Sequence, residues 1–137
     1  MNSFTELAVW QSARDLRISI SKLSKSFPAE EKFRLTDQII RSSRSIATNI
    51  AEGFGRFNHQ DNIRFCRIAR GSLYETLDHL ICAYDERYID ELILKTHKEM
   101  FDDCLKILNG YIAYLKKAKI EKESSIAVQQ LNNITTQ

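Results

Sequence analysis

The sequence has few of the residues that interrupt helices. One proline and four glycines occur among 137 residues, too few for the many tight turns of an all-β domain. Long helices are therefore favoured. No apolar run approaches the roughly 20 residues of a membrane span, and the first ten residues lack the basic segment and apolar run of a secretory signal. We expect a cytoplasmic protein without membrane contact.

Cysteine and histidine are also scarce. Cys66, Cys82 and Cys104 are odd in number and widely spaced, which predicts free thiols in a reducing compartment. His97 and Cys104 can share a helix face, but two ligands do not make a zinc site. The chain has no paired Glu-x-x-His motifs and no recognisable nucleophile with its base. We therefore expect no metal, no cofactor and no enzymatic activity.

Charge is balanced overall but not along the chain. The formal net charge is +2. Residues 34–70 carry seven arginines and three acids, and residues 75–103 carry three bases and nine acids. Residues 106–137 carry five lysines and two acids. Such opposed blocks predict faces of different sign, which charged partners recognise.

Apolar residues recur with the helical period in four segments. Pro28 ends the first segment because it cannot continue the helical hydrogen-bond ladder. Thr36, Asn58 and Asp90 are the expected N-caps of the other three. The four helices are expected at roughly 5–26, 36–55, 59–87 and 91–119.

Four long helices with short connections predict an all-α, up-down-up-down four-helix bundle over residues 1–120. Residues 121–137 are polar and are expected to form a disordered tail. The apolar stripe of segment 91–119 is wider than one bundle core requires. This width predicts either a central position for that helix or a subunit interface.

The stretch "RSSRSIATNIAEGFGR" at 41–56 places small residues on the packed side of its helix. Small side chains let a neighbouring backbone approach, and a buried serine can bond to its own helix. The "GFGR" end lacks the pattern of a phosphate-binding loop. We therefore expect packing roles for Ser42, Ser43, Ala47 and Gly53.

Two sets of basic residues are candidates for binding nucleic-acid phosphates. Arginine and lysine neutralise phosphates and release counterions, so such binding is sensitive to salt. The alternative is a solvated helix surface with local ion pairs, such as Arg41 or Arg56 with Glu52, and the lysines also suit a helix C-terminus. The candidates are Arg34, Arg41, Arg44, Arg56, Arg64 and Arg67, together with Lys116, Lys117 and Lys119.

Arg70 differs from the other arginines because it falls within the apolar sector of its helix. An unpaired charge there would be costly. We therefore expect a structural ion pair with an acid from another helix or another subunit. Glu52 is the first candidate.

Four stretches resemble the four-helix-bundle family encoded in intervening sequences of bacterial 23S ribosomal RNA genes, sometimes labelled S23 ribosomal proteins. They are "LAVWQSA" at 7–13, "FPAEEKFRLTDQI" at 27–39, "RSIATNIAEGFGR" at 44–56 and "FCRIARGSLYETLDHL" at 65–80. The similarity runs from about 5 to 118. Many relatives carry Arg-Arg after Gln-Ile, whereas this chain has Ile40-Arg41, which removes one positive charge and weakens the inference of strong nucleic-acid binding.

The resemblance implies a four-helix bundle that assembles into a ring-like homo-oligomer, with five copies as the expected number. It also implies a relationship to the accessory protein of diversity-generating retroelements, a basic pentamer that engages a reverse transcriptase and nucleic acid. RNA, DNA and a reverse transcriptase are therefore the partners that the resemblance implies.

Two functional hypotheses follow. The first is a non-enzymatic bundle protein that self-associates and binds RNA or DNA through arginine-rich surfaces. Repetition around an oligomer would multiply phosphate contacts that one copy makes weakly. The second is a protein–protein interaction scaffold with no direct nucleic-acid role.

Overall fold

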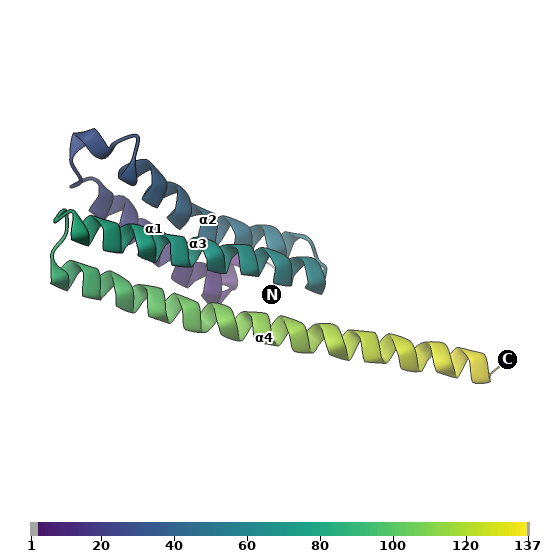
Figure 1. Ribbon diagram of the computed structural model, residues 1–137. Coiled ribbons are helices and arrows are strands. Elements are labelled where there is room, and N and C mark those ends of the chain that lie inside the picture. Colours follow the sequence, from purple (N-terminus) through teal and green to yellow (C-terminus); the bar gives the residue numbers. More distant parts are fainter. Residues whose placement is uncertain (1–2, 137) are drawn as a thin grey trace.

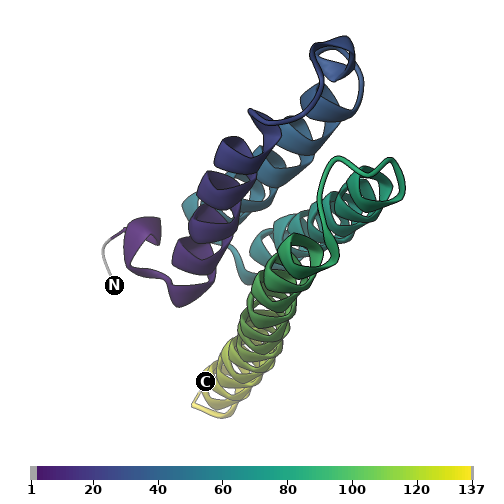
Figure 2. The same ribbon diagram turned by 90° about the vertical axis from the view of Figure 1, so that its left-hand side faces the viewer.

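The computed structural model describes residues 3–136, and every element within that range is helical. The all-α prediction is confirmed. The elements are η1 Phe4–Glu6, α1 Ala8–Ser24, η2 Ala29–Glu31, α2 Leu35–Gly55, α3 His59–Asp85 and α4 Glu91–Thr135. Helix α1 packs on α2 and α4, and α3 packs on the same two helices (Figures 1 and 2). The result is a four-helix bundle in which α1 lies diagonally opposite α3.

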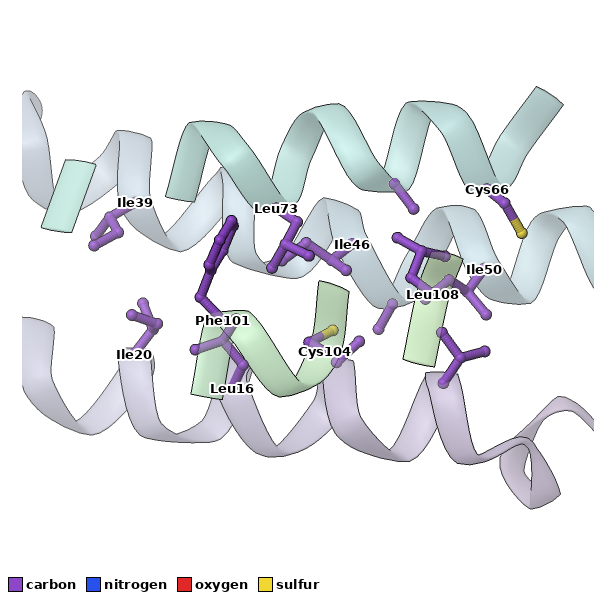
Figure 3. Packing of buried hydrophobic residues seen from close by; sticks show 14 of the residues in the cluster. Leu16, Ile20, Ile39, Ile46, Ile50, Cys66, Leu73, Phe101, Cys104 and Leu108 are labelled. Carbon is purple, nitrogen blue, oxygen red and sulfur yellow. The ribbon is translucent and has the colours of Figure 1, made fainter. Parts of the chain in front are cut away.

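One apolar core joins the four helices (Figure 3). Its members recur in steps of three, four or seven residues along each helix, as in Ile39, Ile46 and Ile50 of α2, so that each helix turns one stripe inward. Leu16, Leu73 and Leu108 meet that stripe from the other three helices and are at most 1% exposed.

Small residues let α2 and α3 lie close together, as the sequence predicts. Ser42 and Thr76 hydroxyls are 2.9 Å apart, and Ser45 and Ser72 hydroxyls are also 2.9 Å apart. A Cβ atom added at Gly53 would lie 2.7 Å from Asn62 Oδ1. These contacts fix the antiparallel alignment of the two helices.

The helix starts confirm two of the three expected N-caps. Asn58 Oδ1 accepts from the Asp61 backbone N–H at 3.0 Å, and Asp90 Oδ1 accepts from the Ile93 N–H at 2.8 Å. The prediction for Thr36 is wrong, because α2 already begins at Leu35. There Glu31 Oε2 accepts from the Leu35 N–H at 2.9 Å, so a carboxylate from the preceding turn does the capping.

Helix α4 is much longer than the sequence predicts. It continues to Thr135 rather than ending near residue 119, so residues 121–135 of the expected disordered tail are helical, and residue 137 lies outside the described residues. Figure 1 shows this end of α4 projecting past the bundle. Leu115 is its last buried residue, and residues 120–136 are all exposed. Because α4 packs only on α1 and α3 among the described elements, a central position does not explain its wide apolar stripe.

Candidate nucleic-acid interface

A basic groove runs between the start of α3 and the part of α4 that leaves the bundle. It has a volume of about 450 Å³. Arg64 and Arg67 line it from α3, and Lys116 and Lys119 line it from α4. These residues belong to two separate predicted sets, which the structure brings together because α3 and α4 run antiparallel.

The charges in this α3–α4 groove are mostly positive. Asp61 also lines it, with Oδ1 3.8 Å from Arg64 Nη2. Lys119 Nζ lies 3.5 Å from Glu123 Oε1. The ion pairs found within residues 3–136 include neither Arg67 nor Lys116. Two cations are thus available to an anionic partner without breaking an ion pair of the chain.

The other predicted residues do not join this groove. Arg41 Nη1 lies 3.7 Å from Asp37 Oδ2, and Arg56 Nη2 lies 3.1 Å from Glu52 Oε1. The local ion pair expected for Arg56 is therefore confirmed. Arg34 is exposed at the start of α2, the opposite end of the bundle, and Lys117 is exposed on α4 outside the groove lining.

Arg44 lines a second basic groove, between α1 and α2, of about 230 Å³. Arg17 and Lys22 of α1 and the C-cap residue of α1, Lys25, join it there. This α1–α2 groove lies on the face of the bundle opposite the α3–α4 groove, because α1 and α2 are the diagonal partners of α3 and α4. The three α1 residues were missed from sequence, although the three-residue step from Lys22 to Lys25 places both on one helix face.

An aromatic pocket of about 510 Å³ opens at the bundle end where α2 turns into α3. Phe54 lines it from the last turn of α2, Phe57 from the α2–α3 turn, and Tyr111 and Tyr114 from α4. The two tyrosine rings are nearly parallel, with centroids 6.3 Å apart. Asn62 Nδ2 donates to the Tyr111 hydroxyl at 3.1 Å. Sequence reasoning missed this pocket, although Tyr111 and Tyr114 are spaced to share a helix face.

The expected Arg70–Glu52 ion pair is absent. Arg70 Nη1 instead donates to Asn109 Oδ1 of α4 at 2.9 Å, and Glu52 pairs with Arg56. Because Ser45 lies beside Ser72, Arg70 is level with the middle of α2. Glu52 lies about one and a half turns further along α2, which explains why it is out of reach.

The cysteines behave as core residues rather than reactive groups. Cys66 and Cys104 are fully buried, and burial raises the pKa of Cys66 to about 12 and that of Cys104 to about 11. Both thiols are therefore protonated near neutral pH. His97 Nδ1 lies 2.8 Å from the Ile93 carbonyl oxygen and Nε2 lies 2.8 Å from Ser19 Oγ, so packing and hydrogen bonds account for this histidine.

Two further observations limit the kinds of site present. Across residues 3–136, no three His, Cys, Asp or Glu side chains gather closely enough to hold a metal ion. Over the same residues, no helix combines the length and apolar character needed to cross a membrane.

Fold and surface together define an antiparallel helical bundle with basic grooves on two opposite faces. The model of the family described as 23S rRNA-intervening sequence protein matches residues 5–110. The chain therefore belongs to that family, as its sequence motifs suggested. No curated protein matches the chain.

The chain is also similar to a solved structure, a protein with unknown function from the S23 ribosomal protein family of Bacteroides thetaiotaomicron VPI-5482. The two share 26% sequence identity and superpose with a TM-score of 0.71. The match covers 77% of this chain and 98% of that chain. The family match ends at residue 110, so Lys116, Lys119 and the projecting end of α4 lie beyond it.

Proposed function

We propose that this protein binds nucleic acid through the α3–α4 groove and that copies of the chain associate with one another. The observation that carries the first part is the convergence of Arg64 and Arg67 with Lys116 and Lys119. Four cations around one hollow, with one carboxylate, suit a phosphate backbone better than a small neutral ligand.

Binding through this groove should depend steeply on salt. For single strands, each phosphate contact contributes about −0.7 to the slope of log affinity against log salt concentration. The double variant Arg67→Gln, Lys116→Gln removes two cations that make no ion pair within residues 3–136. We expect its slope to be shallower by about 1.4. Fluorescence anisotropy with a labelled RNA or DNA oligonucleotide in a sodium chloride series measures this slope.

The α1–α2 groove supplies a matched control. Lys22→Gln, Arg44→Gln removes the same charge from the opposite face, and neither residue is in an ion pair found within residues 3–136. We expect this variant to bind almost as the wild type does. Equal losses in both variants would mean that overall charge, rather than the α3–α4 groove, attracts nucleic acid. A wild-type protein that binds neither RNA nor DNA at low salt would overturn the proposal.

The projecting end of α4 supports self-association. Ile120, Ser124, Ala127, Leu131 and Ile134 alternate in steps of four and three residues, the spacing of a coiled-coil seam. Ile120 is 62% exposed, Leu131 61% and Ile134 70%. This segment continues α4 past the bundle, and residues 120–136 are all exposed within one copy. Other copies offer the same seam, so association between copies covers it.

Substitutions on and off the seam test this association. Leu131→Lys places a charge in the seam, whereas Val128→Lys places one on a different face at similar exposure, 58% against 61%. We expect only Leu131→Lys to lower the mass measured by light scattering. The family resemblance favours five copies. A monomeric wild type would instead favour the scaffold alternative, in which the seam binds a different protein.

A further inference from the structure

The aromatic pocket contains a phenylalanine that the fold alone does not explain. Phe57 follows the end of α2 with φ of 52°, the left-handed conformation in which glycine is strongly preferred. Its side chain is 87% exposed. The backbone conformation of Phe57 is therefore strained, and the small burial of its side chain offsets little of that cost. Strained, exposed positions of this kind are found more often at binding sites than elsewhere.

The pocket presents flat aromatic surface beside polar atoms. Tyr114 is 64% exposed and faces the same hollow as Phe57. His59 and Asn62 also line it. The Tyr111 hydroxyl accepts from Asn62, and burial raises its pKa, so it stays protonated and can donate its own hydrogen. Aromatic rings together with a few hydrogen-bonding groups suit a planar, polar heterocycle such as a nucleobase.

The pocket adjoins the basic groove. The first turn of α3 supplies His59 to the pocket and Gln60 and Asp61 to the groove. Likewise, Leu115 of α4 lines the pocket and Lys116 lines the groove. A strand whose phosphates lie in the α3–α4 groove would thus extend to the aromatic pocket, where one of its bases can stack. The positive charge of the groove is complementary to the phosphates of a nucleic acid. Because the pocket adjoins the groove, a base of the same nucleic acid is the occupant that fits the pocket.

We propose that the ligand is a single-stranded nucleic acid, one base of which sits in the aromatic pocket against Phe57 and Tyr114 while the α3–α4 groove holds neighbouring phosphates. This inference rests on the proposed nucleic-acid function and adds the strand type and a base site. A duplex keeps its bases stacked and paired, so it reaches the groove but not the pocket.

The test compares a labelled single-stranded oligouridine with a blunt-ended RNA duplex of the same phosphate number, both measured by anisotropy at low salt. Removing one base-stacking side chain weakens single-strand binding about tenfold. We expect this loss for Phe57→Ala on oligouridine and no loss on the duplex. Phe57→Trp retains the flat surface and should restore single-strand binding.

Phe33→Ala is the matched control, because Phe33 is 84% exposed at the opposite end of the bundle. It should change neither affinity. Equal effects of Phe57→Ala on both RNAs, or none on either, would overturn the base site while leaving the groove proposal intact if Arg67→Gln, Lys116→Gln still weakens binding. A lower assembly mass of Phe57→Ala in light scattering, with RNA affinity unchanged, would show that the pocket is a contact between copies. That result would also overturn the base site.

Discussion

The turn after α2 and the turn after α3 each contain a residue with left-handed backbone, but the two turns compensate for its strain to different degrees. Phe57 after α2 and Arg87 after α3 both have left-handed backbone, with φ of 52° and 64°. After α3, the Tyr88 N–H donates to the Ala83 carbonyl and the Arg87 N–H to the Tyr84 carbonyl, each at 2.9 Å. These two bonds complete a Schellman motif.

The residues beyond Arg87 then pack against their end of the core, which we call the closed end, although a hollow of about 630 Å³ lies beside Arg87, Tyr88 and Ile89. Ile89 is 5% exposed, and the Tyr88 ring lies 5.8 Å from the buried ring of Phe27. The Tyr88 hydroxyl donates to Glu31 Oε1 at 3.1 Å. Strain at Arg87 is therefore offset by hydrogen bonds and burial around it.

The turn after α2 has much less compensation. The Phe57 N–H reaches the Phe54 carbonyl at 3.4 Å, and the second Schellman bond, from Asn58 to Gly53, is absent among the hydrogen bonds of residues 3–136. The ring of Phe57 stays exposed beside an open pocket. The turn after α3 is thus stabilised by hydrogen bonds and burial, whereas the turn after α2 leaves an aromatic ring exposed beside a pocket.

The largest expected effect is the difference in the free energy of unfolding between alanine variants of a phenylalanine at each end. Phe27→Ala should lower the free energy of unfolding by about 3 kcal/mol, because it empties a buried site in the closed end. Phe57→Ala should change it by less than about 0.5 kcal/mol, since its ring is exposed. Urea denaturation followed by circular dichroism measures both values. Equal losses would show that Phe57 supports the fold.

A second comparison contrasts two glycines at the end of α2. Gly53→Ala should destabilise the protein by about 2 kcal/mol, because the new Cβ would lie 2.7 Å from Asn62 Oδ1 and 2.9 Å from Phe65 Cβ. Gly55→Ala meets no atom within 4 Å and should be neutral or slightly stabilising. Thermal melts of the two variants check this. A harmless Gly53→Ala would mean that α2 and α3 can move apart.

The pH dependence of stability tests whether the open pocket leads water to the core. Cys66 has a pKa of about 12 when folded, against an ordinary value of 9.0. Its raised pKa means that stability is fully present below pH 9 and is lost as pH rises from about 9 towards 12. The slope is at most about 1.4 kcal/mol per pH unit.

Urea titrations between pH 8.5 and 10.5 measure that slope. Cys66→Ala should make it shallower, after allowing for the lower stability of the variant at pH 8. Cys82→Ala, at an exposed position on α3 near the closed end, should change it less. An unchanged slope in Cys66→Ala would mean that the thiol already exchanges with water through the pocket.

The smallest expected effect concerns the two left-handed residues themselves. Glycine relieves the strain at such a position but raises the entropy of the unfolded chain, so the net gain is about 0.5–1 kcal/mol. We expect this gain for both Phe57→Gly and Arg87→Gly in thermal melts. Only Phe57→Gly should weaken single-strand binding. A destabilised Phe57→Gly would assign the aromatic ring to the fold instead.

Much of the bundle could be predicted from local sequence. The apolar period gave four helices, and Asn58 and Asp90 cap two of them as expected. The N-cap of α2 could not be found this way, because Glu31 reaches Leu35 only after the η2 turn has formed. The extension of α4 to Thr135 was also missed. A mostly polar segment can still form a helix when its few apolar residues share one side.

The candidate interface was predicted only in part. Arg64, Arg67, Lys116 and Lys119 were named as candidates from charge alone. Their convergence, the departure of Arg44 to another face and the pairing of Arg70 with Asn109 all depend on which helix turns lie side by side. That alignment is a long-range property and is invisible to a count of charges.

The sequence by itself determined the helical class, the inward stripes and the family motifs, because these depend on the spacing of neighbouring residues along one chain. Only the tertiary structure decided which charges meet, which aromatic rings remain exposed and where α4 leaves the bundle. Those outcomes depend on antiparallel packing, which places the first turns of α3 beside residues 116–120 of α4 and leaves the pocket beside Phe57 and Tyr114 open.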